Sequence, residues 1–428
     1  MTPEEQLDTQ ETSHPTWWSN SQRAFLIPNR RGNYIHVSSE SYKRTLKCWG
    51  IRGRAHPNED ASPADRVMSR VQQIRDVDYS GPLAGYDAGL VLCNGHRALA
   101  TKSPDRVEAK EGEWPMISSI LEQMFKLENV DQRAHFFGWL QIAEECVRTS
   151  KPSPGQALVF AGPRNSGKNF IQDIITAILG GRTARPYPWF VGQTTFNADL
   201  FEAEHLMIAD EVPFQDIKSR RVFGSKIKDV TVNSIHSCHG KHANAVPLKP
   251  CWRLTISVND EEENLAMLPP LDSSIKDKIM LFKVAPAIMP MPCDKPRDRE
   301  AFWEEVKKEI PAFVYFLQNF EIPDGLGDSR FGISAFHHPD LVATVEDMSP
   351  ETQLLELIEI TILPGGPFEG TLPELKSRLF GDPTFGRQAE KLLYFNNALQ
   401  TYMRRLHGAR PDRISKRKSH GKVLWEIR

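Results

Sequence analysis

The chain has 428 residues, enough for about two to four domains with sizeable hydrophobic cores. Its 53 Lys and Arg against 55 Asp and Glu give a formal net charge of -2, so any nucleic-acid or membrane partner must be met by local patches. Six scattered cysteines without a C-x-x-C pair favour a reduced, cytoplasmic protein over a disulfide framework. The polar start MTPEEQLDTQETSHP and the lack of an apolar run of ~20 residues exclude a signal peptide, a transit peptide and a membrane span.

Residues 1–150 carry signals for short strands and helices. We expect residues 1 to about 15 to be disordered, RAFLIPNRRGNYIHVS to form two strands around a turn, and SESYKRTLKCWGI to form a helix. After the predicted loop RGRAHPNEDASP, GLVLCNGHRALATKSP alternates strand and turn signals. The apolar residues of WPMISSILEQMF and DQRAHFFGWLQIAEECVR recur at helical spacing. The sequence therefore predicts a small α+β region at 1–75 and a strand-turn and helical region at 76–150.

An α/β core is predicted at 151–290. TSKPSPGQ forms a boundary at 149–156, and a second Pro-rich breaker, APAIMPMPCDKP, lies at 285–296. Between them the apolar strands ALVFAG, HLMIAD and WRLTISV alternate with helical segments, which is typical of an α/β sheet.

Within this core, GPRNSGKN has the form of a phosphate-binding loop. It follows an apolar strand and precedes the helix-like NFIQDIITAIL. Glycines let backbone N–H groups surround phosphates, the helix N-terminus adds a favourable dipole, and the lysine reaches the terminal phosphates. A glycine turn with a chance lysine is the alternative, but strand, loop and helix agree. The expected ATP-binding residues are Gly162, Pro163, Arg164, Asn165, Ser166, Gly167, Lys168 and Asn169.

Two further strand ends complete the expected catalytic site. HLMIADE ends in Asp210 and Glu211, where one carboxylate can bind Mg²⁺ and the other can orient the attacking water, unless the pair simply faces solvent. WRLTISVND ends in Asn259, which can contact the γ-phosphate or serve only the turn. Asn169 stands where such loops usually carry Ser or Thr, and its amide oxygen is also a hard donor. The expected cofactors are ATP and Mg²⁺, with Asn169 and Asp210 as metal ligands.

A histidine-rich segment follows at 236–242. HSCHGKH brings His236, Cys238, His239 and His242 together, but the spacings fit no familiar zinc pattern. VTVNSIHSCHGKHANAVPLKP reads instead as two β-arms that meet at residues 239–241. We favour the hairpin, and a structural metal stays the alternative.

The remainder is predicted as a helical connection at 291–348 and a basic domain at 349–428. REAFWEEVKKEIPAFVYFLQNF, SPETQLLELIEI, TLPELKSRLF and KLLYFNNALQTYMRRL carry helix signals, and DRISKRKSHGKVLWEIR reads as a basic hairpin. From 401 to 428, nine Lys and Arg stand against two acids. Helices before a basic hairpin predict a winged-helix-like DNA-binding domain, with a solvated basic tail as the alternative. Its expected DNA-binding residues are Arg413, Lys416, Arg417 and Lys418.

The order GPRNSGKN, HLMIADE, GKHANAVPLK, RLTISVN and KDKIMLF resembles superfamily 3 helicases, over about residues 157–285. These include the papillomavirus and parvovirus replicative helicases and the helicase half of poxvirus- and phage-type primase-helicases. GHRALATKSPDRVEAKEGEWP through GWLQIAEEC looks like the region that precedes the helicase in the phage and plasmid branch. The resemblance implies an AAA+-type ATPase fold, assembled as a ring, usually hexameric, around a nucleic-acid strand.

The resemblance also implies roles for single residues. Lys168 would be the phosphate lysine, Asp210 and Glu211 the metal and water-activating pair, and Asn259 the sensor. Lys241 and His242 match the pair that the family places at the tip of a hairpin lining the central channel.

Two positions depart from the family: Asn169 in the phosphate-binding loop, and the position of the arginine that acts in trans. The arginine that completes a neighbouring subunit's site falls on Lys278 here, four residues before Phe282. Lysine supplies the positive charge but not the bidentate fork, so either Lys278 is a weaker finger or nearby Lys276 takes the role.

We therefore expect an α/β protein with an AAA+-like P-loop ATPase core, an N-terminal α+β and helical region, and a C-terminal winged-helix-like domain. The expected function is that of an ATP-dependent, ring-forming replicative DNA helicase of a phage, plasmid or integrated mobile element, which translocates on single-stranded DNA. Its expected partners are single-stranded, forked or origin DNA, further copies in a homo-hexamer, and a separate primase or initiator, in the cytoplasm of a bacterial host. A primase is not expected in 1–150, which lacks paired acidic metal motifs.

Two alternatives stay open. One is an ATPase switch in defence or partitioning that unwinds little DNA. The other is a DNA-binding initiator ring whose Asn169 and Lys278 have lost turnover.

Overall fold

The structure is a computed structural model that describes residues 15–127, 129–209, 217–241, 243–293, 295–419 and 421–428. The stretch that we expected to be disordered, residues 1 to about 15, lies outside these described ranges except for its last residue. The chain forms two compact units, each built from three stretches. The first holds Met1–Glu211, Lys226–Val258 and Asp277–Phe336, and the second holds Val212–Ser225, Asn259–Lys276 and His337–Arg428. Among the described helices, none has the length and apolar character needed to cross a membrane.

The first unit begins with a four-stranded sheet in the order β3-β2-β1-β4, against which two helices pack. The expected pair of strands around a turn is confirmed, with Phe25 opposite Val37 and Pro28 opposite Tyr34. The sequence predicted the first helix but not the second. Their bounds are β1 Trp17–Ser19, β2 Ala24–Pro28, β3 Tyr34–Val37, α2 Ser39–Cys48, α3 Pro63–Ile74 and β4 Asp76–Val77.

A three-stranded sheet in the order β5-β7-β6 follows. Its strands are β5 Tyr79–Gly81, β6 Gly89–Cys93 and β7 His96–Ala100. Asn94 and Gly95 join β6 to β7, and both have positive φ angles, 48° and 80°. Such angles at both central residues are typical of a tight hairpin turn, so the strand-turn pattern predicted here is confirmed.

The centre of the first unit is a five-stranded sheet in the order β11-β12-β15-β10-β16, in which all neighbours are parallel. Its strands are β10 Ala157–Ala161, β11 Thr183–Ala184, β12 His205–Ala209, β15 Arg253–Val258 and β16 Ile279–Lys283. Every residue of β10 and β15 is buried, as expected for strands covered on both faces. The predicted α/β fold with strands from ALVFAG, HLMIAD and WRLTISV is confirmed.

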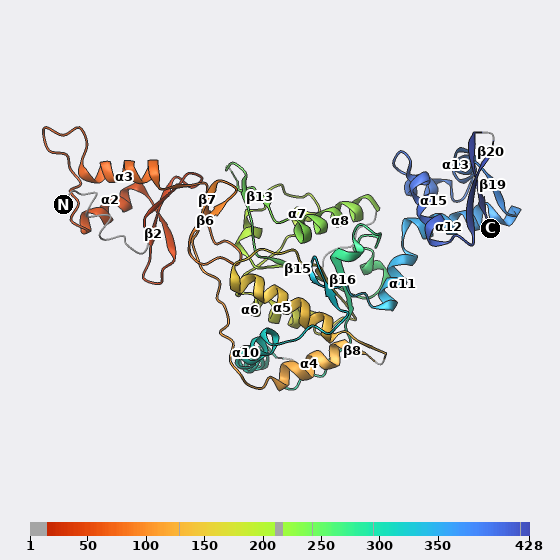
Figure 1. Ribbon diagram of the computed structural model, residues 1–428, viewed down its shortest axis with the longest axis horizontal. Helices are drawn as coiled ribbons and strands as arrows, with labels where there is room; N and C mark the ends of the chain where they lie inside the picture. The colour runs from red at the N-terminus through yellow and green to blue at the C-terminus, as the bar shows by residue number, and fades with distance from the viewer. Residues whose placement is uncertain (1–14, 128, 210–216, 242, 294, 420) are drawn as a thin grey trace. The chain divides into compact units, whose positions relative to one another are not determined.

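Four helices cover one face of this sheet, and Figure 1 shows α7 on the other side. Side chains of β10 and β16 pack with these helices in one core that is rich in aromatic rings, such as Phe125 against Phe136 with centroids 4.9 Å apart. The bounds are α4 Pro115–Phe125, α5 Arg133–Thr149, α6 Lys168–Ile178, α10 Pro296–Gln318 and α7 Tyr187–Phe190. The short strands β8 Lys126–Leu127 and β9 Val130–Asp131 join α4 to α5.

The predicted β-arms around residues 239–241 form, but they are shorter than the sequence indicates. β13 His236–Cys238 pairs with β14 Val246–Leu248, whereas Val230–Val232 end the helix α8 Ile217–Val232. The β-branched V-T-V run favours a strand by propensity, but burial of the helix end overrides it, and Trp252 donates to the carbonyl oxygen of Val230. Shorter elements of this unit are η1 Ala198–Glu202, β17 Gly327–Asp328 and β18 Gly332–Ile333; η2 Lys276–Lys278 lies at its boundary.

The second unit contains a bundle of helices and a three-stranded antiparallel sheet in the order β19-β21-β20. The expected basic hairpin is confirmed as β20 and β21. The predicted helix KLLYFNNALQTYMRRL is two helices, because Asn397 lies in the left-handed region at φ 67° before the second one begins. The bounds are α9 Glu262–Leu265, α11 Pro339–Asp347, α12 Pro350–Thr361, η3 Leu363–Gly365, β19 Phe368–Gly370, α13 Leu372–Phe380, α14 Gly386–Leu392, α15 Ala398–Ala409, β20 Ile414–Ser419 and β21 Lys422–Ile427.

Candidate functional site

The glycine-rich loop lies at the carboxyl end of β10, between the two strands that flank β10. The N–H of Gly162 donates to the carbonyl oxygen of Val258 at the end of β15, at 3.3 Å. On the other side, the N–H of Val284 donates to the carbonyl oxygen of Ala161 at 2.7 Å. A side chain at Gly162 would collide with the carbonyl oxygen of Val284, so only glycine fits. Ligands of open parallel sheets bind at this edge, where successive connections leave in opposite directions.

Lys168 is buried inside the loop. Only 6% of its surface is exposed, and its ammonium donates to the carbonyl oxygens of Gly162 at 2.7 Å and Pro163 at 2.8 Å. Asn165 and Gly167 have φ angles of 63° and 88°, which curl the loop before α6 begins at Lys168. The loop therefore places a cation beside the N-terminus of a helix, an arrangement suited to phosphate.

The other expected loop residues differ in exposure. Ser166 is buried, Pro163 is half-buried, and Arg164 and Asn169 are exposed. Asn169 lies in the first turn of α6 and is exposed. A side-chain amide oxygen is a donor type that suits a divalent cation, so the residue type and exposure of Asn169 are compatible with the predicted Mg²⁺ site.

The predicted acidic pair lies outside the described residues. β12 ends at Ala209, directly before Asp210 and Glu211, and it is the neighbour of β15 in the sheet. Asn259 directly follows Val258, whose carbonyl accepts from Gly162. The roles of Asp210, Glu211 and Asn259 stay predictions.

A buried polar network that the sequence did not reveal joins α6 to β12 and β15. The ring of His205 contacts the hydroxyl oxygens of Thr176 and Thr255, each at 2.7 Å, and Gln172 donates to Thr255 at 2.9 Å. Burial, and then the charge of Arg185, lower the pKa of His205 to about 3, so its imidazole is neutral. This network ties the helix of the glycine loop to the strands that lead to Asp210 and Asn259.

Lys278 forms an ion pair just before the amino end of β16. Its ammonium lies 2.5 Å from a carboxylate oxygen of Asp277, and its side chain is 13% exposed. Arg330, on the β17–β18 turn, reaches the other oxygen of Asp277 at 3.7 Å with 46% of its side chain exposed. Lys276 is exposed. Sequence spacing could not find Arg330, because it is 52 residues beyond Lys278.

The hairpin of β13 and β14 presents Lys241 to solvent at its tip, while His242 lies outside the described residues. Asn197 fixes this tip: its side chain accepts from the N–H of His239 at 2.7 Å and donates to the carbonyl oxygen of Ser237 at 3.0 Å. His236 is engaged by the carbonyl oxygen of Asn233 at 2.8 Å. Among the described residues, no group of three or more His, Cys, Asp or Glu could hold a metal ion.

The basic residues of the last hairpin differ in what they contact. Arg413 is held by Glu359 at 2.7 Å and by the carbonyl oxygen of Arg428, and Arg417 pairs with Glu369. Lys416 lies over the ring of Trp425, 5.6 Å from its centroid. Lys418 is exposed. Compared with Arg413 and Arg417, Lys416 and Lys418 are therefore more available to bind a ligand.

Comparison with known proteins shows the fold. No family model matches the chain, and no curated protein matches its sequence. The apo structure of the NrS-1 C-terminal region is 12% identical, with a TM-score of 0.57 over 99% of this chain and 98% of that chain. An A form apo structure of the same region gives a TM-score of 0.56 over 100% and 99% of the two chains. The α/β fold is therefore shared along the whole length.

Two chains named as helicases are much less similar. JCV Helicase is 13% identical with a TM-score of 0.25, over 48% of this chain and 60% of that chain. SCCmec type IV Cch, named an active helicase, is 9% identical with a TM-score of 0.31, over 92% and 73%. We draw nothing further from these two.

Proposed function

We propose that this protein is an ATP-dependent, ring-forming DNA helicase of a phage, plasmid or integrated mobile element. The observation that carries the proposal is the buried ammonium of Lys168 inside a glycine loop, at the carboxyl edge of a five-stranded parallel sheet. The motif order that resembles superfamily 3 helicases supports the same conclusion.

At the nucleotide site, the loop N–H groups and Lys168 bind the phosphates of ATP. Glu211 orients the attacking water, and Asn259 contacts the γ-phosphate. Asn169 and Asp210 would hold Mg²⁺, which would supply positive charge to neutralise the phosphates. The network around His205 joins α6, β12 and β15, and this contact between the loop helix and the two strands supports the proposal.

Two surfaces are proposed to bind DNA. Lys241 at the tip of the β13–β14 hairpin contacts the backbone of a single strand in the central channel of a homo-hexamer. The order of elements from α12 to β21, one α-helix, the short η3, a strand, three α-helices and two strands, supports a winged-helix-like domain. Lys416 and Lys418 give its hairpin a positive face.

The test compares ATP binding, ATP hydrolysis and unwinding of forked duplexes with opposite tails. Lys168→Ala should lose nucleotide binding, because the ammonium that meets the phosphates is gone. Glu211→Gln should keep binding but lower hydrolysis on the order of a hundredfold, as expected when water activation is lost. Lys151→Ala, an exposed lysine outside the loop, is the matched control.

The outcomes separate the alternatives. Hydrolysis at the wild-type rate in Glu211→Gln would show that the acidic pair is wrongly assigned. ATP hydrolysis without DNA stimulation or unwinding would favour a switch in defence or partitioning. DNA binding without any hydrolysis by the wild type would favour an initiator ring.

A further inference from the structure

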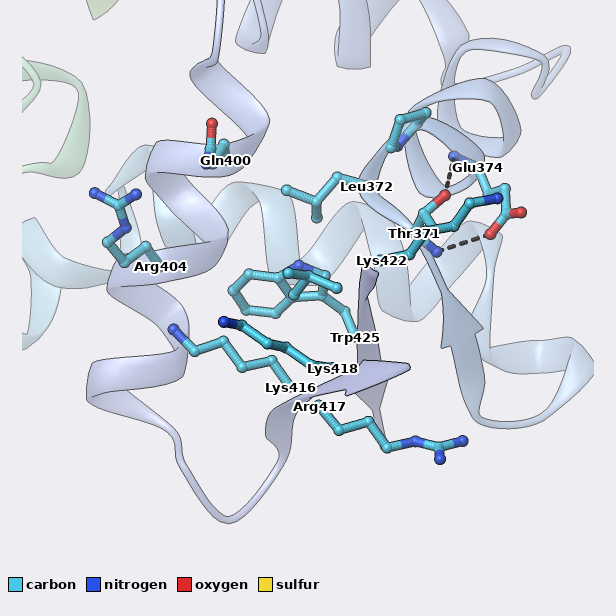
Figure 2. Close-up of a pocket in the computed structure, with 12 residues that line it drawn as sticks. Thr371, Leu372, Glu374, Gln400, Arg404, Lys416, Arg417, Lys418, Lys422 and Trp425 are labelled. Atoms are coloured by element: carbon cyan, nitrogen blue, oxygen red, sulfur yellow. Dashed lines mark hydrogen bonds between the residues drawn. The ribbon is translucent and has the colours of Figure 1, made fainter. Parts of the chain in front are cut away.

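A pocket of about 840 Å³ lies in the second unit, between the β20–β21 hairpin and two helices. Figure 2 shows side chains that reach it from the N-terminus of α13, from α15 and from both strands. Its volume falls within the range of small-molecule sites and exceeds what one phosphate group fills. The pocket is therefore a separate feature from the nucleotide site of the first unit.

The rim of the pocket is cationic. Lys416 and Lys418 alternate with Arg417 along β20, so they share one face of the hairpin, and Figure 2 shows both extending past Trp425 while Arg417 points away. Arg404, one turn after Gln400 on α15, contributes from the helix side. Within the described part of the chain, Arg404, Lys416 and Lys418 have no carboxylate partner.

The glutamate that lines the pocket already accepts a hydrogen bond within the protein. Glu374 accepts from the backbone N–H of Thr371 at 2.7 Å in the capping box that begins α13. That hydrogen bond, helped by Lys422 and Arg378, holds the pKa of Glu374 below its usual range. Glu374 thus stays ionised to cap the helix; its charge acts on Lys422 and Arg378, and among the described residues it forms no ion pair with Arg404, Lys416 or Lys418.

The floor of the pocket is apolar. Trp425 is opposite Lys416 in the hairpin and is 5% exposed, and Val423 is opposite Lys418 and 43% exposed. Leu372 completes the floor from α13. The hairpin face that packs into the core through Ile414 and Ile427 therefore continues outward as an apolar strip below three cations.

A site with cations at its rim and apolar side chains at its floor favours a ligand with two parts: a flat apolar group and an anionic group attached to it. A nucleotide of single-stranded DNA has this form, because its base is free to leave the strand axis while its phosphates stay outside. A base within a duplex is stacked and paired, and it reaches a pocket only after extrusion. A protein that merely holds a duplex needs cations on an open surface and has no use for the apolar floor.

We propose that this pocket binds one unpaired nucleotide of single-stranded DNA. The base lies against Leu372, Val423 and Trp425, and the flanking phosphates lie beside Arg404, Lys416 and Lys418. The choice of DNA as the ligand rests on the proposed function, but the site is formed entirely by the second unit and needs no ATP.

The binding test uses the full chain without nucleotide and three fluorescent probes: a single strand, the same strand with abasic positions, and the blunt duplex. Val423→Ser removes apolar surface without changing charge, so binding of the normal strand should weaken about fivefold and binding of the abasic strand should not change. The double variant Lys416→Gln, Lys418→Gln should weaken the binding of both strands. It should also make the fall of log K with log salt less steep, by about 1.4 in the slope. Lys391→Gln, an exposed lysine on α14, is the charge control and should match the wild type.

A cross-linking experiment locates the contact. A strand that carries 5-iodouracil is irradiated on the full chain, and cross-linked peptides are mapped. Cross-links on Trp425 or elsewhere in β20–β21, lost with competing single strand but not with duplex, support the pocket. Cross-links confined to other parts of the chain, or equal weakening of normal and abasic strands by Val423→Ser, would overturn it.

The result is separable from the test of the helicase proposal. Because no ATP is present, loss of nucleotide hydrolysis leaves the pocket result unaffected. Conversely, if the chain unwinds forked DNA but binds the normal and the abasic strand equally well, only the pocket proposal is disproved.

Discussion

At the scale of single residues, the amino end of β16 carries two cations around one carboxylate. Lys278 and Arg330 both approach Asp277, but Arg330 exposes 46% of its side chain against 13% for Lys278, and it offers a planar guanidinium. Guanidinium groups bind phosphate oxygens in a bidentate manner, which an ammonium does not. For the proposed ring, we therefore propose Arg330 rather than Lys278 as the residue that completes a neighbouring subunit's site.

We expect Arg330→Ala to bind ATP normally and to lower hydrolysis about a thousandfold, as for loss of an arginine finger, whereas Lys278→Ala should be much milder. Mixing Arg330→Ala with Lys168→Ala subunits should restore part of the activity, since each supplies what the other lacks. ATP turnover of the mixtures, with assembly verified by light scattering, is the measurement. Lack of any rescue in an intact assembly would argue for a self-contained site, and a severe Lys278→Ala defect would return the role to Lys278.

His205 gives a prediction for pH dependence. Its pKa is about 3 in the folded chain, below its value of 6.5 when unfolded, so the unfolded state binds the extra proton as the pH falls below about 6.5. The stabilisation by neutral His205 is complete above pH 6.5 and declines toward pH 3. Between about pH 7.5 and pH 5 this decline amounts to about 2 kcal/mol.

The comparison variant is His205→Asn, which cannot titrate. It should melt below the wild type at pH 7.5, because the hydrogen bonds to Thr176 and Thr255 are weakened. The difference between the two melting temperatures should shrink as the pH is lowered to 5. A difference that is constant with pH would mean that His205 is not held neutral.

Residues of the site were predictable where the signal is local. Gly162, Gly167 and Lys168 occur within seven positions, next to the strand and helix that they join. Asn197 and His205 gave no signal, because their partners lie 42 and 50 positions away in sequence. Only the folded sheet brings such residues together.

At the scale of elements, the β13–β14 hairpin depends on a residue outside it. Asn197 makes two side-chain hydrogen bonds to the hairpin, and its backbone N–H donates to the carbonyl oxygen of His239 at 3.1 Å. Asn197 is 6% exposed, so these bonds are shielded from water. It acts as a positioning residue for Lys241.

We expect Lys241→Ala to keep basal ATPase activity and assembly while losing DNA stimulation and unwinding together, because its charge meets the DNA backbone. Asn197→Ala should lower DNA stimulation less and leave the salt dependence of DNA binding unchanged, since no cation is removed. Asn197→Asp, which retains the acceptor for His239, should recover part of the loss. Unwinding at the wild-type rate by Lys241→Ala would rule out the channel hairpin.

The buried strands of the central sheet were easier to predict from the sequence than the helix α8. β10 and β15 are buried throughout, so their apolar runs are unambiguous. α8 was missed, because its basic residues hide the helical period and its last turn is the β-branched V-T-V run. The register of the last hairpin was not readable from sequence, although its alternation decides that Lys416 and Lys418 share a face.

At the scale of the whole molecule, the two units are interleaved in sequence. The segment Val212–Ser225 begins three residues after the end of β12, and Asn259–Lys276 follows β15 directly, yet both belong to the unit that contains His337–Arg428. Contacts within that unit hold them: Arg221 lies 5.1 Å from the ring centroid of Phe395, and Asp272 pairs with Arg405 at 3.1 Å. The first segment begins immediately after the predicted catalytic residue Glu211, and the second begins with the predicted catalytic residue Asn259.

This interleaving bears on how the gene can change. A recombination event that replaced residues 337–428 alone would leave Arg221 and Asp272 facing a foreign surface, while the two internal segments would still descend from the old gene. An exchange upstream of residue 212 replaces no part of that unit. An exchange that preserves the contacts of Arg221 and Asp272 must therefore carry residues 212–225 and 259–276 together with residues 337–428.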